Sequence, residues 1–223
     1  PSYFQYVFYN QLQNLCTSLR STLSTLYILT TFSRNSTPTT SLALTATLTF
    51  LTRDGVGMAS TLLFSRFAPP FSLTSDTKKW RYLADLTCNF SLIIEFVSSY
   101  IYHLPPTLFT ITLCITSSLR ASCGMMAASA AGPIDYFWSS SDSKNLPSFH
   151  SKSNAQSTIS NGLGLILGGV VSKLSVKFPK SLGVGVGFYG FLTSLHLWSN
   201  YRMLKLVGFK YVNQERLKIL VEG

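Results

Sequence analysis

Apolar stretches separated by short polar breaks run along most of the chain. Residues 11–32 carry leucines at the spacing of one helix face, beginning with Leu12, Leu15 and Leu19, with Gln, Ser and Thr between them. This pattern predicts an amphipathic helix, and "NSTPTT" at 35–40 breaks it. We therefore expect an N-terminal amphipathic helix and linker over 1–40, followed by a helical domain over 41–223.

The next part of the chain contains further candidate helices. Residues 41–52 are apolar, and Gly55 and Gly57 after them suit either a turn or a close contact between helices. Residues 83–104 are about as long as the roughly 20 residues that a helix needs to cross hydrocarbon. Another candidate span begins after the prolines at 105–106 and runs to about residue 119. These segments predict helices that are apolar over much of their surface.

Residues 133–158 are rich in serine and carry scattered charges, which predicts a long polar loop. Two apolar segments follow it, at 159–172 and 182–201. The first is short, so it could be tilted, re-entrant or incompletely inserted. The whole pattern predicts an all-α fold, a polytopic membrane bundle of about six helices with one long polar loop.

The composition favours a membrane protein over an unusually apolar soluble one. Only 12% of the residues are charged and 46% are apolar, and the mean hydropathy is +0.27. A water-soluble domain carries about twice that share of charge. Serine and threonine are frequent, but their hydroxyls can hydrogen-bond to the helix backbone and so are tolerated in lipid.

The net charge of +10 does not indicate a nucleic-acid-binding protein, because the basic residues fall in short groups between apolar stretches and match no such motif. We expect them to be interface anchors that contact anionic lipid headgroups, although solvated helix ends are the alternative. The predicted anchors are Lys78, Lys79, Trp80, Arg81, Trp198, Arg202 and Lys205.

Small residues spaced four apart predict close helix packing and contacts with other membrane subunits. Gly185, Gly187 and Gly190 also have the spacing of a dinucleotide fingerprint, but no acid follows at 200–210, so no cofactor is expected. The predicted packing positions are Ala128, Gly132, Gly164, Gly168, Gly183 and Gly187.

Glu95 lies in the middle of a candidate span, where a carboxylate facing lipid would cost several kcal/mol. It must face the bundle, be protonated or pair with a partner, for which Arg120, His103 and His196 are the candidates. Such a buried acid either fixes helix packing or takes part in proton-linked transport or substrate binding.

His196 and Asn200 are four residues apart and share a helix face. No second metal ligand and no Ser–His–Asp arrangement accompanies His196, so a packed, hydrogen-bonded histidine is favoured over a catalytic one. Together with Glu95 and Arg120, these two residues form the predicted polar site of the bundle. No metal site and no catalytic residue is expected.

The four cysteines, Cys16, Cys88, Cys114 and Cys123, include no C-x-x-C pair and lie in apolar or Ser/Thr-rich surroundings. Free thiols are therefore expected, rather than a disulfide framework or a metal site.

Five segments in the same order resemble the root UVB-sensitive family, formerly catalogued as a domain of unknown function. The resemblance implies helical membrane proteins, associated in plants with plastids, UVB responses, vitamin B6 homeostasis and auxin transport, and without established catalytic residues. The matching segments are "TRDGVGM" (52–58), "KKWRYLAD" (78–85) with Glu95, "QSTISNGLG" (156–164), "LTSLHLWSNYR" (192–202), and Asn213 with Arg216.

The chain departs from the family pattern at Asn89, Ser153 and Ser157, where the resemblance implies acids. A depleted polar site favours a non-catalytic accessory or scaffold subunit of an organellar membrane complex. The alternative is a carrier or binding protein for a small metabolite linked to vitamin B6, with Glu95, His196 and Arg120 lining the path.

The expected location is an organellar membrane, either the mitochondrial inner membrane or a plastid membrane. Acidic residues are absent before Arg53, and the chain begins at Pro1 without a methionine. Both features are compatible with a precursor whose presequence has been removed.

Overall fold

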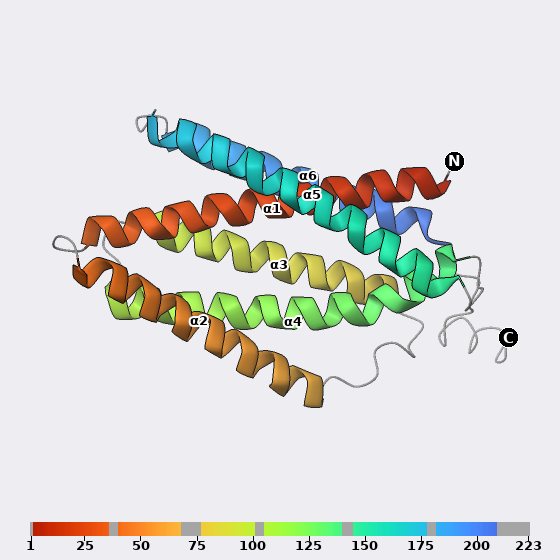
Figure 1. The fold of residues 1–223 in the computed structure, drawn as a ribbon, viewed down its shortest axis with the longest axis horizontal. Coiled ribbons are helices and arrows are strands. Elements are labelled where there is room, and N and C mark those ends of the chain that lie inside the picture. Colours follow the sequence, from red (N-terminus) through yellow and green to blue (C-terminus); the bar gives the residue numbers. More distant parts are fainter. Residues whose placement is uncertain are drawn as a thin grey trace, which may run out of the picture.

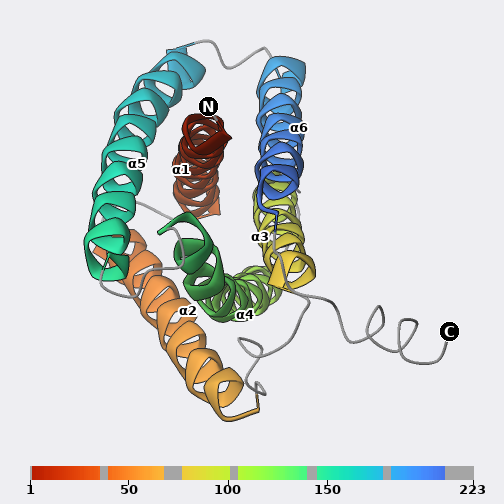
Figure 2. The ribbon, with the colours of Figure 1, turned by 90° about the vertical axis from the view of Figure 1, so that its right-hand side faces the viewer.

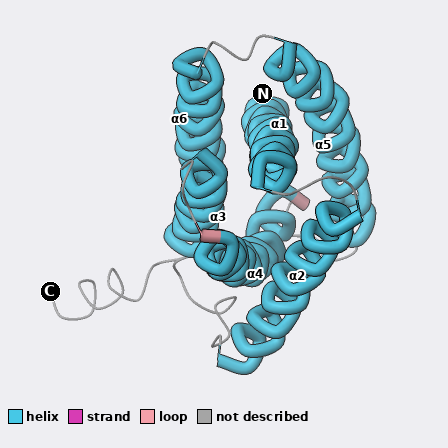
Figure 3. The backbone as a smooth tube through the Cα atoms, turned by 90° about the vertical axis from the view of Figure 1, so that its left-hand side faces the viewer, coloured by secondary structure: helices cyan, strands magenta, loops and turns pink. Residues whose placement is uncertain are grey.

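The computed structural model describes residues 2–35, 40–67, 77–100, 105–139, 145–177 and 182–208. The predicted all-α fold is confirmed for these residues, because every element in them is a helix (Figures 1 and 3). The helices are α1 (Ser2–Asn35), α2 (Thr40–Phe67), α3 (Thr77–Tyr100), α4 (Pro106–Trp138), α5 (Leu146–Lys177) and α6 (Leu182–Leu206).

Serine and threonine hydroxyls donate hydrogen bonds to backbone carbonyls of their own helices, which explains how so many of these residues are accommodated. Thr17 donates to the carbonyl of Gln13 at 3.0 Å, and Thr22 donates to that of Ser18 at 2.9 Å. Similar bonds to the preceding turn recur in the other helices. Proline marks a helix start at Pro106, where the missing N–H is not needed.

Helix α1 occupies the centre of the bundle. Figure 2 shows it between α5 and α6, with α3 and α4 beneath and α2 packed on the outer side of α4. Cys16, Leu19 and Leu23 of α1 form a buried cluster with Leu192 of α6. The N-terminal helix therefore packs within the same bundle as the later helices.

The prediction of a polar loop at 133–158 is wrong. Helix α4 continues to Trp138 and α5 begins at Leu146, while residues 140–144 lie outside the described part. One polar side chain of this segment packs between helices, since Asn14 donates to Ser157 at 3.1 Å, and just beyond the segment Ser160 donates to Gln11 at 2.8 Å. The segment 159–172 is accordingly part of a 32-residue helix rather than a short separate span.

Of the two alternatives for the glycines in "TRDGVGM", the turn is wrong, because α2 runs through them. Gly57 makes the close contact: a Cβ there would lie 2.5 Å from Oγ of Ser117 in α4. Gly55 has no atom within 4 Å of such a Cβ.

The other predicted packing positions differ among themselves. A Cβ at Gly164 would lie 2.5 Å from Ser18 Cβ, and one at Gly168 would lie 2.8 Å from Thr22 Cβ, so α5 approaches α1 closely along this line. Three positions make no such contact, because Gly132 and Gly187 face open space and Ala128 is exposed. The surroundings of Gly183 lie outside the described residues.

Gly164→Ala is expected to lower the free energy of unfolding by about 1–3 kcal/mol, because the new methyl group would also lie 3.1 Å from the backbone oxygen of Leu15. Gly162→Ala is the matched control on the same helix, where nothing lies within 4 Å. It should raise stability by up to about 1 kcal/mol through helix propensity. Thermal unfolding of both variants in one detergent measures the difference, and equal shifts would refute the close α1–α5 contact.

The distribution of polar and apolar side chains is partly the reverse of that in a water-soluble protein, although apolar clusters also lie inside the bundle. Buried positions include several charged and amide side chains, among them Gln13, Arg20 and Glu95. Large apolar side chains are exposed on every helix. Within the described residues, α4 is the one helix that is both long and apolar enough to cross a membrane.

Candidate functional site

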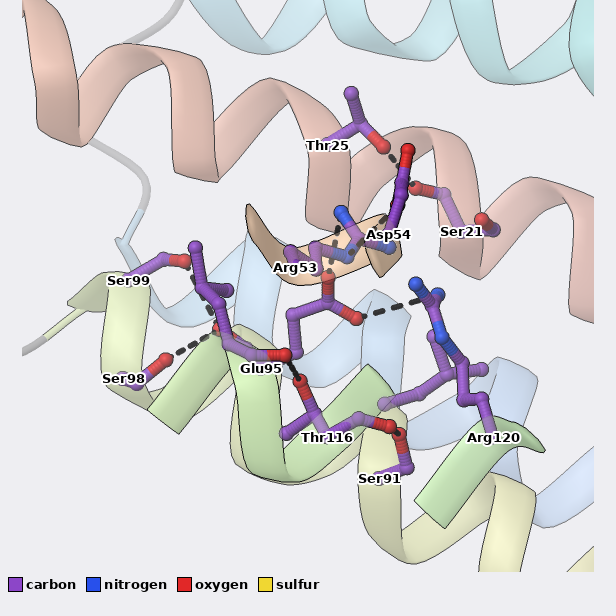
Figure 4. A network of polar contacts seen from close by, with 12 residues as sticks. Ser21, Thr25, Arg53, Asp54, Ser91, Glu95, Ser98, Ser99, Thr116 and Arg120 are labelled. Carbon is purple, nitrogen blue, oxygen red and sulfur yellow. Dashed lines mark hydrogen bonds and ion pairs between the residues drawn. The ribbon is translucent and has the colours of Figure 1, made fainter. Parts of the chain in front are cut away.

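Glu95 of α3 lies at the centre of a charged cluster and is only 1% exposed. Its Oε1 is 3.4 Å from Nη1 of Arg53 in α2, and its Oε2 is 3.4 Å from Nη1 of Arg120 in α4 (Figure 4). Each carboxylate oxygen therefore faces one guanidinium group. This arrangement ties three helices together through one acid.

The backbone around this acid is also well satisfied. The hydroxyls of Ser98 and Ser99 both donate to the carbonyl oxygen of Glu95 at 2.9 Å (Figure 4). Ser91 donates to the carbonyl of Thr116 and so joins α3 to α4. These bonds tie the backbone of α3 and α4 together beside the acid, while the two ion pairs hold the carboxylate, which suits a structural role for the cluster.

A second cluster lies between α1, α3 and α6, around a completely buried arginine. Arg20 of α1 is 0% exposed, and its Nη1 donates to Oδ1 of Asn89 in α3 and, at 3.4 Å, to Oγ1 of Thr193 in α6. Its Nε donates to the carbonyl of Cys16 at 3.4 Å. A single side chain from the central helix thus contacts both neighbouring helices.

Asn89 links Arg20 to His196, which is 1% exposed. The amide Nδ2 of Asn89 lies 3.0 Å from Nδ1 of His196 and donates at 2.6 Å to the carbonyl of Asp85. The ring nitrogen accepts from the amide when the histidine carries its proton on Nε2. His196 is therefore oriented by an amide, as expected for a packed histidine.

Several polar atoms in this second cluster make no hydrogen bond with the described residues. They are Nη2 of Arg20, Oε1 of Gln13, and both amide atoms of Asn200, whose side chain is fully buried. No carboxylate of the described helices lies within 4.0 Å of the Arg20 guanidinium; Asp85 pairs with Arg81 at 3.5 Å instead. Buried groups of this kind call for water or a ligand.

Tyr189 joins α6 to α3 beside these clusters. Its hydroxyl donates to the carbonyl of Leu92 at 2.8 Å, and its ring stacks on Phe96 with centroids 4.2 Å apart. Tyr27 of α1 meets the same Phe96 ring edge-on at 5.1 Å. An aromatic group therefore packs α1, α3 and α6 together at this level of the bundle.

The residues predicted to form one polar site are divided between the two clusters. Arg120 pairs with Glu95, whereas His196 contacts Asn89 instead. Asn200 is buried one helical turn from His196, and His103 lies outside the described residues.

Sequence reasoning missed Arg20 and Arg53 as members of the buried clusters. A signal was present for the first, because Arg20 is the one charged residue among the leucines of 11–32 and shares a helix face with Gln13 and Ser24, which are also buried. There was less indication in the sequence that Arg53 is buried, since Arg53 stands beside Asp54 and near two glycines in a segment that suited a turn.

The predicted anchors lie mainly at the surface. Trp198 and Lys205 are exposed, and the Arg202 guanidinium lies 5.8 Å from the ring centroids of both Trp198 and Tyr9. Arg81 instead points inward to its ion pair with Asp85. At the other predicted group, Lys79 is exposed while Lys78 and Trp80 are half-buried.

The described helices bring together no group of three His, Cys, Asp or Glu side chains that could hold a metal ion. The first cluster is an ion-paired contact between three helices, whereas the second contains unpaired donors and acceptors and a cation, Arg20, that has no carboxylate of the described residues within 4.0 Å. The second cluster is therefore the candidate binding site.

Comparison with known proteins identifies relatives along the whole chain. The family described as "Vitamin B6 photo-protection and homoeostasis domain" matches residues 1–223. "RUS family member 1" of Dictyostelium discoideum is 30% identical over 220 residues, covering 99% of this chain and 40% of the relative. "Protein root UVB sensitive 3" of Arabidopsis thaliana is 26% identical over 221 residues, covering 99% of this chain and 48% of the relative.

The chain thus spans less than half the length of these curated relatives. No solved structure matches it significantly. The family match over the full length confirms the resemblance drawn from the five sequence segments. This chain belongs to the root UVB-sensitive family.

Proposed function

We propose that this chain is a membrane-embedded, non-catalytic binding or carrier protein for a small anionic metabolite. The proposed site is the cluster of Arg20, Asn89, His196 and Asn200. One observation carries the proposal: Arg20 is completely buried, has a free N–H group, and lacks a carboxylate partner among the described residues.

A buried cation without a directly paired carboxylate is costly, since Asp85 acts on Arg20 only from beyond 4.0 Å, and an anionic ligand in contact with the guanidinium would lower that cost. Unpaired polar atoms on α1 and α6, the helices that meet at Arg20, would suit such a ligand. Nη2 of Arg20 and Nδ2 of Asn200 are free donors, while Oδ1 of Asn200 and Oε1 of Gln13 are free acceptors. The site is thus suited to a molecule with one anionic group and additional hydroxyl or amine groups.

The family description supplies a first ligand to test, because it concerns vitamin B6. Phosphorylated forms of this vitamin combine a phosphate ester with a ring hydroxyl and, in one form, an amine. Pyridoxamine 5′-phosphate has these groups and no aldehyde, so it cannot form an imine with lysine. Unphosphorylated pyridoxamine is the matched comparison without the anion.

The partly reversed distribution of side chains supports the membrane part of the proposal. Hydrocarbon would cover the exposed leucines, isoleucines and phenylalanines, while the charged groups remain inside the bundle. The basic surface groups would contact anionic lipid headgroups. An organellar membrane, mitochondrial inner or plastid, is the proposed location.

Purified full chain in lipid nanodiscs is expected to bind pyridoxamine 5′-phosphate saturably in equilibrium dialysis and pyridoxamine much more weakly. Asn89→Asp should lower the affinity at least about tenfold, equivalent to about 1.4 kcal/mol, because the new carboxylate would occupy the Arg20 guanidinium.

Asn154→Asp is the matched control, since it makes the same charge change at an exposed position of α5. It should bind like the unmodified chain. Equal binding of both vitamers, or unchanged affinity in Asn89→Asp, would refute an anion site at Arg20.

A scaffold subunit of a membrane complex is the second candidate. The favouring observation is α2, whose main neighbour is α4 and which exposes a row of large apolar side chains. Lipid would cover that row as well as a partner would, so the buried arginine without a directly paired carboxylate is the stronger argument. Subunits that stay bound in mild detergent would favour the scaffold. The exposed residues of this row are Leu44, Leu48, Leu51, Met58, Leu62, Leu63 and Phe64.

A further inference from the structure

Helix α6 carries an outward-facing row of side chains that changes from apolar to aromatic to basic along the helix. The row consists of Phe191, Trp198, Arg202 and Lys205, spaced seven, four and three residues apart, and all four are exposed. These spacings place the side chains on one face of a helix. The row therefore has the same order of polarity as a phospholipid, from its acyl chains to its charged headgroup.

A contact with α1 holds the aromatic and basic part of this row. The Arg202 guanidinium lies 5.8 Å from the ring centroids of both Trp198 and Tyr9, and the two rings meet edge-on with centroids 5.4 Å apart. A ring face attracts a guanidinium group at this distance. Helices α1 and α6 lie side by side in the bundle (Figure 2), so the two rings position Arg202 at the surface where these helices meet.

No acid of the described helices neutralises the two basic residues of the row. Every carboxylate in the described part of the chain lies within 4.0 Å of a different arginine or of a histidine. Within the same residues, neither Arg202 nor Lys205 has such a partner. Two neighbouring cations beside aromatic rings are suited to an anion at a membrane interface, where aromatic side chains are enriched.

We propose that Tyr9, Trp198, Arg202 and Lys205 form a binding site for one anionic glycerophospholipid of the surrounding membrane. The lipid phosphate would contact the guanidinium and ammonium groups, which form charge-assisted hydrogen bonds with phosphate oxygens. The aromatic rings would lie at the level of the glycerol. The acyl chains would follow the exposed ring of Phe191 along α6.

A lipid in this site would lie near the second polar cluster. Asn200 precedes Arg202 by two positions, and Gln13 follows Tyr9 by about one helical turn. By contacting both helices at their surface, the lipid would fasten α1 to α6 next to these buried groups. Such a site requires the proposed membrane location and is independent of the proposed anion site at Arg20.

Native mass spectrometry of the full chain in detergent, titrated with phosphatidylglycerol and phosphatidylcholine, measures the lipid preference. Both lipids carry a phosphate diester, but only phosphatidylglycerol has a net negative charge. The unmodified chain is expected to retain phosphatidylglycerol preferentially. Arg202→Gln and Lys205→Gln should each lower this preference about fivefold, the effect of removing one basic residue near an anionic headgroup.

Arg66→Gln is the matched control, because Arg66 is an exposed arginine in the last turn of another helix, α2. It should keep the preference. Excess inorganic phosphate should not displace the lipid, since a free anion gains nothing from the apolar part of the row. The lipid site is overturned if both lipids are retained equally, if Arg66→Gln loses as much preference as Arg202→Gln, or if inorganic phosphate removes the lipid.

Two further results distinguish this site from the proposed function. Retention of neither lipid would overturn the lipid site and count against the membrane location as well, whereas equal retention of both lipids overturns the lipid site alone. Binding of pyridoxamine 5′-phosphate should be unchanged in Arg202→Gln, because that ligand is assigned to Arg20. A parallel loss would show that the surface row and the buried arginine form one anion site, which overturns a separate lipid site.

Discussion

Glu95→Gln is expected to lower the free energy of unfolding by about 3–5 kcal/mol, the usual cost of removing one partner from a buried ion pair. Glutamine keeps the shape of the side chain but removes the buried counter-charge that the guanidinium groups of Arg53 and Arg120 share. For a chain of this length the midpoint of thermal unfolding should fall by roughly 10 °C. Differential scanning fluorimetry in one detergent measures the shift.

The neighbouring acid provides a matched control. Asp54 lies 4.0 Å from Nε of Arg53 and its side chain is 65% exposed, so Asp54→Asn should change stability by less than about 0.5 kcal/mol. Combining Glu95→Gln with Arg120→Gln should recover part of the loss, since one uncompensated cation is removed. Equal stability of Glu95→Gln and Asp54→Asn would show that the cluster does not hold the bundle together.

Ile166→Lys distinguishes hydrocarbon from water around α5, because the two solvents predict different results. Ile166 is 67% exposed. If lipid covers it, the charge should cost about 2.5–3.5 kcal/mol near the centre of a bilayer and lower the midpoint of unfolding in nanodiscs. If water covers it, the change should stay within about 0.5 kcal/mol.

Thr158→Lys on the same helix is the control, since Thr158 is exposed and already polar. It should be tolerated in both cases. The unmodified chain is also expected to remain in the membrane pellet after alkaline extraction. Release into the supernatant, together with an unperturbed Ile166→Lys variant, would refute the membrane-embedded bundle.

Local patterns predicted where the helices lie, because apolar periodicity and proline breaks act over a few residues, but α2, α4 and α5 extend well beyond the predicted segments. The region 133–158 was the main failure. Its serines and asparagines are typical of loops, yet Ser157, and Ser160 just beyond the region, form polar contacts that join α5 to α1. A polar face that packs against another polar face cannot be recognised from one helix alone.

The candidate site was predictable only in part, for a similar reason. A carboxylate in an apolar span must have a partner, so Arg120 could be named as one of three candidates for Glu95. The grouping of Arg20 with Asn89 and His196 depends on how three distant helices meet. Local spacing can indicate that Arg20 is buried, but it carries no information about that meeting, so the partners of Arg20 emerged only from the structure.

The central place of α1 has a consequence for how the protein assembles. Helix α1 is synthesised before several of its hydrogen-bond partners: Ser18 donates to a carbonyl 143 residues later, and Arg20 donates to a hydroxyl 173 residues later. Contacts between residues so far apart in the sequence form slowly. Until α5 and α6 emerge, the arginine lacks these partners, so we expect early α1 to depend on transient protection by the insertion machinery or a chaperone.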